Sequence, residues 1–333
     1  MTAAPPASSA LSGLAAPAAG APDTPDKYAA LLARCAGLAP IPTAVAHPCD
    51  ASSLGGALQA AELGLIVPIL VGPAARIRQV AAEQGMALRD AVIIDAPHSH
   101  ASAARAVEAV RAGDAELLMK GSLHTDELLH EVTSSGSGLR TGRRLSHVFA
   151  MDVPRYHKPL FITDAAVNIF PTLNEKADIC RNAIDLVRVL GVERPKVAIL
   201  SAVETVTDKI PSTIDAAALC TMSRRGQITN GLLDGPLAFD NAISREAAIT
   251  KGIDSEVAGD PDILLVPDLE AGNMLAKQLT FLAGAEAAGI VLGARVPIIL
   301  TSRADSVRAR IGSCAIAVLL AHARRTAEAA AQV

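Results

Sequence analysis

The residues best suited to chemistry stand near the C-terminus, after a short apolar run. Pro297 to Leu300 is followed by Ser302 and Arg303, and a helical pattern begins a few residues later. A strand that runs into a helix start directs backbone N–H groups and the positive end of the helix dipole at one point, where a guanidinium adds charge. Ser302 and Arg303 therefore indicate an anion site, for example for phosphate. A helix cap beside a solvated arginine is the alternative interpretation.

A second group of cations lies in a glycine-containing stretch, residues 134–144, which carries Arg140, Arg143 and Arg144. Arginine matches the geometry of phosphate because its planar fork donates two parallel hydrogen bonds. The stretch suits gripping a phosphate, or the phosphates of a nucleotide tail. A solvated basic loop explains the same residues equally well.

Polar side chains also follow several other apolar runs, and in parallel sheets ligands bind at the carboxyl ends of strands. These side chains are therefore candidate substrate contacts. They are Lys120, Asp164, Asn168, Asp234, Asp240, Asn273 and Lys277. For residues 234–240 a turn with Asx hydrogen bonding is the commoner explanation, and isolated lysines are usually surface charges.

The elements that must position these residues alternate between short apolar runs and helical periodicity, which predicts an α/β fold with a largely parallel sheet. The clearest helix is Thr172 to Leu190, where Thr172 and Glu175 form a capping box and Gly191 follows the end. A last helix is expected from Asp305 to about Ala330, on the surface. The expected strands are Leu65–Val71, Ala91–Asp95, Glu116–Met119, Leu160–Asp164, Val197–Ser201, Leu232–Asp234, Ile263–Val266, Gly289–Leu292 and Ile298–Thr301.

Size and composition narrow the class of protein. A chain of 333 residues is expected to form two domains. The net charge of −4 offers no electrostatic footprint for nucleic acid or an anionic membrane, and no apolar run is long enough to span one. Five widely spaced cysteines indicate a reducing cytoplasm without disulfides. Residues 1–24, nearly all Ala, Pro, Ser and Gly, are expected to be a disordered leader.

Several common sites are missing from the sequence. There is no phosphate-binding G-x-x-x-x-G-K-[ST] motif, and the glycines at 136, 138 and 142 have the wrong spacing for a dinucleotide fingerprint. The histidines, including His98 and His100, lack carboxylates at ligand spacing, so no metal site is expected.

Taken together, these segments resemble the phosphate acetyl/butyryl transferase family. The similar stretches run in order from about residue 55 to the C-terminus. They are Leu117–Gly121, Leu139–Arg143, Leu145–His147, Ile162–Ala166 with Asn168, Asp234–Leu237 with Asp240–Ile243, Val257–Asp260, Glu270–Asn273 and Leu300–Ser306. The resemblance implies a two-domain αβα fold of the isocitrate/isopropylmalate dehydrogenase type, with the active site in the cleft between the domains. Domain one is then residues 25–153 plus 290–333, domain two is residues 154–289, and the protein is a cytoplasmic homodimer.

The activity implied by the resemblance is a reversible transfer of an acetyl group: acetyl-CoA plus phosphate gives acetyl phosphate plus CoA. Coenzyme A and phosphate are substrates, and no cofactor is expected. Phosphate butyryltransferase activity on butyryl-CoA or another short acyl-CoA is the alternative. Two further possibilities are a transferase that uses acylated carrier protein and a non-catalytic accessory module once joined to a partner enzyme through the leader.

The resemblance also implies roles for the C-terminal site. Arg303 clamps phosphate, Ser302 hydrogen-bonds the reacting carbonyl or the phosphate, and Arg143 or Arg144 supplies a second positive charge. No covalent acyl-enzyme is expected.

One position departs from the family pattern. Acetyl-type members place an aspartate seven residues after the serine, where this chain has Ala309. Asp305, three residues after Ser302, is the replacement we nominate as general base, since helical geometry would set it on the same face. The alternative is that Asp305 caps the helix or pairs with Arg308.

Overall fold

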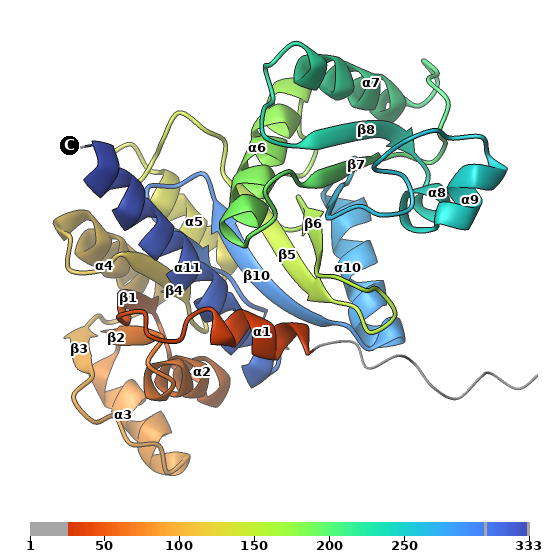
Figure 1. Cartoon of the computed structure of the whole chain (residues 1–333). Helices are drawn as coiled ribbons and strands as arrows, with labels where there is room; N and C mark the ends of the chain where they lie inside the picture. The colour runs from red at the N-terminus through yellow and green to blue at the C-terminus, as the bar shows by residue number, and fades with distance from the viewer. Residues whose placement is uncertain (1–25, 303–304, 332–333) are drawn as a thin grey trace, which may run out of the picture.

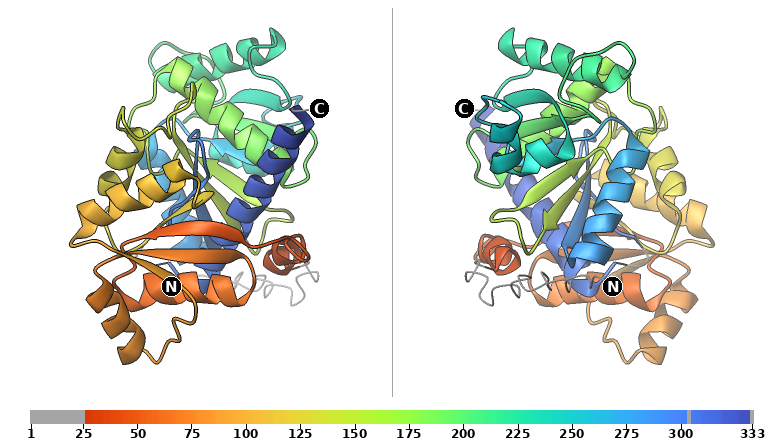
Figure 2. Two further views of the ribbon diagram at one scale, coloured as in Figure 1. Left: turned by 90° about the vertical axis from the view of Figure 1, so that its left-hand side faces the viewer. Right: turned by 90° about the vertical axis from the view of Figure 1, so that its right-hand side faces the viewer.

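The computed structural model describes residues 26–302 and 305–331, which form one eleven-stranded sheet with helices on both sides (Figure 1, Figure 2). The strands are β1 (Ile41–Ala46), β2 (Ile66–Gly72), β3 (Val92–Asp95), β4 (Leu117–Lys120), β5 (Ser146–Asp152), β6 (Leu160–Thr163), β7 (Lys196–Leu200), β8 (Leu232–Leu237), β9 (Ile263–Leu265), β10 (Glu286–Leu292) and β11 (Ile298–Ile299). The helices are α1 (Lys27–Ala33), α2 (Ala51–Glu62), α3 (Ala74–Glu83), α4 (Ser99–Ala112), α5 (Thr125–Thr133), α6 (Leu173–Val189), α7 (Pro211–Arg224), α8 (Phe239–Ile243), α9 (Arg245–Thr250), α10 (Leu269–Ala283) and α11 (Val307–Ala331). The α/β prediction is therefore confirmed.

The sheet consists of two parallel groups joined by an antiparallel centre. Its strand order is β3-β2-β1-β4-β11-β10-β5-β6-β9-β7-β8. The first five strands are parallel to one another, and so are the last four. Between them β10 is antiparallel to β11, β5 to β10, and β6 to β5. Three reversals make the second parallel group run opposite to the first.

The core is aliphatic, as the low aromatic content requires. Alternate strand residues face two layers of helices because successive side chains point to opposite sides of a sheet. One face packs on α1, α2, α3, α6, α7 and α11. The other packs on α4 and α5 over the first strand group and on α8 to α10 over the second.

Helix α6 begins as the sequence predicts. The Thr172 Oγ1 atom accepts a hydrogen bond from the Glu175 N–H at 3.4 Å, and Glu175 Oε2 accepts one from the Thr172 N–H at 2.8 Å. Gly191 follows the helix at φ +95, a conformation that favours glycine. Both ends of this helix were therefore encoded locally.

Helix α11 corrects one expectation. It was expected on the surface because charged residues stand at both ends, but every residue from Cys314 to Ala321 is buried. The middle of the helix, Ile311 to Ala321, is apolar or small on all sides, which is the pattern of a helix enclosed by protein. It packs against α2, α1 and β10.

Two strands escaped prediction. In β1, Pro42 is a residue that normally argues against a central strand. In β5, polar residues interrupt the apolar pattern. The predicted domain boundary at 153/154 directly follows β5, whereas the one at 289/290 falls inside β10. The division into domains stays a prediction, and the leader lies outside the described residues.

Candidate functional site

The carboxyl ends of β4 and β11 lie side by side. Ile299 pairs with Met119, which sets Leu300 beside Lys120. Lys120 is only 4% exposed, and its Nζ donates a hydrogen bond to the Gly121 carbonyl at 3.3 Å. A side chain at position 121 would begin 2.4 Å from the carbonyl oxygen of Ala46, the last residue of β1, so the close contact between the ends of β4 and β1 requires glycine. The edge of the sheet where β4 and β11 end therefore brings Lys120 and Ser302 into one region.

Ser302 and Asp305 hydrogen-bond each other. The Ser302 N–H donates to Asp305 Oδ2 at 2.6 Å, and the Asp305 N–H donates to the Ser302 carbonyl at 3.2 Å. The ion pairs of Arg308 are with Asp26 at 3.0 Å and with Glu286 at 2.5 Å, and not with Asp305, among the described residues. Arg303 lies outside the described residues. The catalytic roles assigned to these residues stay predictions.

Arg310 is a residue of this region that the sequence analysis missed. It is 2% exposed, its Nη1 donates to Thr301 Oγ1 at 2.7 Å, and its Nη2 donates to the Ser302 carbonyl at 2.8 Å. Burial lowers the pKa of its guanidinium. Helix α2 makes room for it, because a Cβ at Gly56 would lie 2.7 Å from the Arg310 Cδ. Arg310 therefore fixes the backbone that carries Ser302.

The three predicted arginines do gather. Arg140, Arg143 and Arg144 line one cleft of about 720 Å³ on the face of the sheet covered by α5. The start of α5, at Thr125 and Asp126, also lines it, only five residues after the end of β4. The segment that leaves β4 thus connects this cleft, the arginine cleft, to the Lys120 region.

The three arginines differ in how far they are neutralised. Arg143 pairs with Asp185 at 2.5 Å. Arg144 pairs with Glu175 at 3.1 Å, and its Nε donates to Asn168 Oδ1 at 2.7 Å. Arg140 has no ion pair within the part of the chain that the structure describes. Its charge is therefore the most available to an anionic ligand.

Asp164 organises the wall of the arginine cleft. Its Oδ1 accepts from the backbone N–H groups of residues 166 and 167 at 2.9 and 3.0 Å. Its Oδ2 accepts from the His147 N–H at 3.2 Å and from Asn168 Nδ2 at 2.5 Å. Burial raises the pKa of the Asp164 carboxyl, and these hydrogen bonds act in the opposite direction. Because all of these contacts are within the protein, the described role of Asp164 is to hold the loop, and substrate contact by it stays a prediction.

Helix α10 contributes the next two candidates. The Asn273 Nδ2 donates to the Ala165 carbonyl at 3.2 Å, so it braces the same loop. Lys277 lies one turn further along, with its Nζ 6.0 Å from the centre of the Phe281 ring. Asn273 is therefore joined to the arginine cleft through the loop after β6.

Asp234 and Asp240 are not brought to either region. They belong to β8 and to the start of α8, and β8 is the last strand of the sheet, six positions from β11. At a strand spacing of about 4.8 Å this corresponds to roughly 29 Å. Asp240 instead pairs with Lys251 at 3.1 Å, and Asp234 Oδ1 accepts from the Gly235 N–H.

His147 lies behind the cleft and was also missed. It is fully buried in β5, its ring stacks edge-on against Phe149 at 4.4 Å, and neither ring nitrogen has a well-formed hydrogen bond among the described residues. Burial lowers the pKa of His147 to about 3, which the nearby Leu300 carbonyl offsets only in part. The imidazole is therefore neutral at physiological pH.

Two kinds of feature are absent from residues 26–302 and 305–331. No helix there combines the length and apolarity needed to cross a bilayer. No three His, Cys, Asp or Glu side chains there are grouped as metal ligands. Each of the five cysteines, all within the described ranges, is a free thiol.

Comparisons with known proteins agree on one family. The profile described as phosphate acetyl/butaryl transferase matches residues 100–318. A phosphate acetyltransferase of Rhizobium meliloti is 66% identical over 310 residues, 93% of this chain and 98% of that protein. A phosphate butyryltransferase of Clostridium acetobutylicum is 42% identical, over 84% of this chain and 92% of that protein. The crystal structure of a branched-chain phosphotransacylase from Enterococcus faecalis V583 superimposes with a TM-score of 0.74 at 30% identity, covering 85% of this chain and 99% of that one.

Proposed function

We propose a phosphate acetyltransferase activity from one premise: the chain belongs to the phosphate acetyl/butyryl transferase family. It is an acyltransferase, and the reaction is acetyl-CoA plus inorganic phosphate in equilibrium with acetyl phosphate plus coenzyme A. The observation that carries the choice of acyl group is the 66% identity to a phosphate acetyltransferase over nearly the whole of both chains, against 42% to a butyryltransferase.

The substrates are anions, and two basic regions are available for them. We assign the arginine cleft to the phosphates of coenzyme A, since its size suits a large ligand and Arg140 carries a charge without an ion pair in the described residues. We assign inorganic phosphate to the region of Lys120, Ser302 and Arg303. There a tetrahedral centre forms at the acyl carbon, and its negative oxygen requires positioned donors.

Acyl-CoA synthesis also needs a base for the thiol of coenzyme A. A free thiol has a pKa of about 8.5, so little thiolate is present at neutral pH. We propose that the Asp305 carboxylate accepts the S–H proton, the thiolate sulfur bonds to the acyl carbon, and phosphate leaves. Its 2.6 Å hydrogen bond to the Ser302 N–H places this carboxylate at the serine. Asp305→Asn is expected to slow acyl-CoA synthesis, and wild-type rates would assign the proton to another group.

The decisive test of the acyl group is a side-by-side assay of phosphate-dependent CoA release from acetyl-CoA and butyryl-CoA. A pocket difference of two methylenes is worth only about 1.6 kcal/mol, roughly 15-fold, so activity on both substrates is expected. Acetyl-CoA is expected to be preferred because of the higher identity to a phosphate acetyltransferase. A clear preference for butyryl-CoA would replace the proposal by its alternative. Acetylated carrier protein is expected to give little turnover. Strong turnover with it would indicate a transferase that moves the acyl group between carrier protein and phosphate.

The phosphate site is tested by Arg303→Ala. Loss of charge-assisted hydrogen bonds is expected to raise the KM for phosphate by about tenfold to a hundredfold. Arg105→Ala is the matched control, because Arg105 is an exposed arginine on α4 that contacts only a backbone carbonyl, that of Asp95. An unchanged KM in Arg303→Ala removes Arg303 from the mechanism.

We further propose that the chain is a cytoplasmic homodimer of two-domain subunits of the isocitrate/isopropylmalate dehydrogenase type. The two parallel strand groups support the two domains. The exposed apolar residues Met274, Phe281 and Leu282 of α10 support association, and the five free thiols support a reducing compartment. Light scattering of the purified chain tests the dimer, and a monomer at micromolar concentration would contradict it.

A further inference from the structure

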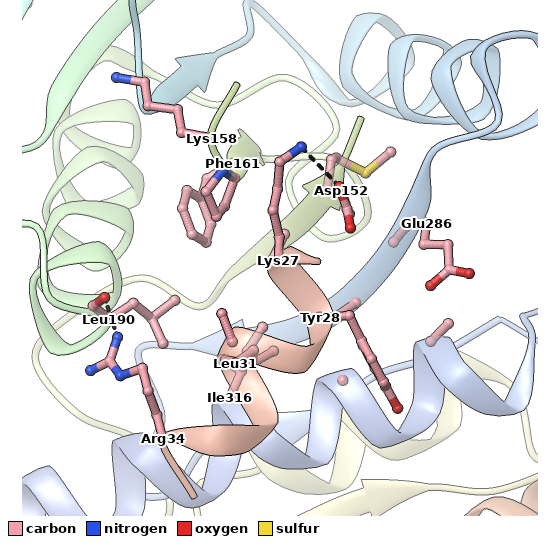
Figure 3. A pocket seen from close by; sticks show the side chains of 18 of the residues that line it. Lys27, Tyr28, Leu31, Arg34, Asp152, Lys158, Phe161, Leu190, Glu286 and Ile316 are labelled. Carbon is pink, nitrogen blue, oxygen red and sulfur yellow. Dashed lines mark hydrogen bonds and ion pairs between the residues drawn. The ribbon is translucent and has the colours of Figure 1, made fainter. Parts of the chain in front are cut away.

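A second cavity, of about 370 Å³, lies on the sheet face opposite the arginine cleft, between α1, α11 and the strands β5, β6 and β10 (Figure 3). Its apolar wall comes from both strand groups: Ile316 belongs to α11, Phe161 to β6, and Leu190 follows α6. None of the residues assigned to the proposed reaction lines this space, although Ala309, the position of the aspartate in acetyl-type members of the family, does. We call it the α1 cavity.

Helix α1 forms one side of the α1 cavity. Lys27, Leu31 and Arg34 are spaced i, i+4 and i+7, so they share one side of the helix, and Figure 3 shows all three directed at the cavity. Lys27 Nζ bonds Asp152 Oδ1 at 2.9 Å. At the other end the Arg34 guanidinium donates to the Val189 carbonyl at 2.8 Å and to the Leu190 carbonyl. Helix α1 is therefore attached by a charged side chain at each end, Lys27 and Arg34, with the apolar side chain of Leu31 between them.

The space exists because the wall is built from small residues. Ala150, Ala288 and Gly312 line it, and a Cβ at Gly312 would lie 3.4 Å from the Ala288 Cβ and 3.5 Å from the Tyr28 ring, ordinary contact distances. Cavities lined by apolar groups are favourable places for aliphatic ligands, because filling them restores dispersion contacts that the wall lacks.

Four cations and three carboxylates line the α1 cavity. Each carboxylate is matched: Asp152 to Lys27, Asp262 to Lys158 at 2.8 Å, and Glu286 to Arg308 at 2.5 Å. Two of the cations, Lys158 and Arg308, also pair with carboxylates outside the lining, those of Asp260 and Asp26.

Arg34 is the fourth cation, and among the described residues its guanidinium donates hydrogen bonds only to backbone carbonyls. Two of the five N–H groups of its guanidinium are engaged there. A planar guanidinium with remaining donors is suited to a carboxylate.

We propose that the α1 cavity is a binding site for an amphipathic monocarboxylate, with its aliphatic chain among Leu31, Phe161 and Ile316 and its carboxylate on Arg34. The ligand joins elements of both strand groups on the face away from the arginine cleft. This site is separate from the proposed reaction, so its test measures binding and needs no turnover.

The test titrates the full chain with octanoate, hexanoate and butanoate by calorimetry. Each buried methylene is expected to tighten binding about fourfold. Octylammonium, which has the same chain and the opposite charge, is expected to bind at least about tenfold more weakly. Saturating CoA and phosphate are expected to leave octanoate affinity unchanged. Competition with CoA, equal binding of octylammonium, or no binding of octanoate overturns the proposal.

Two variants locate the site. Arg34→Gln is expected to weaken octanoate about tenfold, whereas Arg105→Gln, the same change at an arginine on the opposite face, leaves the affinity unaltered. Ala30→Trp, at an exposed cavity position on α1, is expected to fill the mouth and abolish binding while acetyl transfer continues. Full octanoate affinity in both Arg34→Gln and Ala30→Trp would rule the α1 cavity out.

Discussion

Replacing His147 by leucine is expected to flatten the dependence of stability on pH below pH 6.5. His147 is completely buried between Phe149 and the Leu300 backbone, and burial lowers the pKa of its imidazole to about 3. Leucine has a similar volume, cannot titrate, and keeps the backbone N–H that bonds Asp164.

The sign follows from where the proton binds. In the unfolded chain the histidine pKa is about 6.5, so between pH 6.5 and 3 the unfolded state takes up a proton that the folded state refuses. The contribution is intact above pH 6.5 and is lost as the pH falls. At pH 5 the loss is RT ln(1 + 10^1.5), about 2 kcal/mol, and at pH 7.5 it is close to zero. The result at pH 5 is insensitive to the folded pKa as long as that pKa stays well below 5.

The assay is urea unfolding of wild type and His147→Leu at pH 7.5 and pH 5.0. Other titrating groups, His47 among them, contribute to both proteins and cancel in the double difference. The variant is expected to lose about 2 kcal/mol less than wild type between the two pH values. His124→Leu, at an exposed position, controls for the removal of an imidazole as such. Equal losses in wild type and His147→Leu would show that the buried ring is protonated or reaches water.

Three other predictions concern the two basic regions. Arg310→Met is expected to lower kcat about a hundredfold with the fold retained by circular dichroism, because a displacement of about 1 Å at the reacting groups can cost that much. Gly56→Ala, whose new Cβ would meet the Arg310 side chain at 2.7 Å, is expected to lower kcat in the same direction. Gly55→Ala, which meets only the flexible end of a methionine at 3.1 Å, is expected to leave kcat near wild type. Arg140→Gln is expected to raise the KM for CoA more than Arg143→Gln, about tenfold against a few-fold, because an aspartate already neutralises Arg143; equal effects would contradict this assignment.

The sequence predicted best what is encoded locally. The capping box at Thr172 and Glu175 needs only neighbouring residues, and it forms as predicted. Arg140, Arg143 and Arg144 lie within five residues of one another, so a single loop suffices to gather them at one cleft. Strand ends were placed to within a few residues because apolar runs stop where polar loops begin.

Which site residues far apart in the sequence come together in the fold was harder to predict from the sequence. Polar residues that follow strands converge on one edge of a sheet only where the strands run in the same direction. Three antiparallel pairings around β10 and β5 reverse the second group, so the chain leaves β6 toward Asp164 in the direction opposite to that in which it leaves β4 at Lys120. Strand order adds a further separation, because β8 with Asp234 is the outermost strand. Neither the direction of a strand nor its position in the sheet can be predicted from the residue pattern of that strand alone.

Arg310 shows why a residue that positions a site can be hidden in a sequence. An arginine at the start of an alanine-rich helix indicates a solvated helix end, and the helix was accordingly expected on the surface. Burial of a guanidinium costs less where its donors are matched, and here the Thr301 hydroxyl and the Ser302 carbonyl accept from the two terminal nitrogens. The buried Nε of Arg310 has no partner among the described residues. Those acceptors face Arg310 only after α11 packs against α2, where Gly56 leaves the space. The packing of α11 in the core and the position of Ser302 therefore depend on each other. A substitution that weakens the packing of α11 is expected to displace Arg310, and through it Ser302, and so to lower the rate of the reaction.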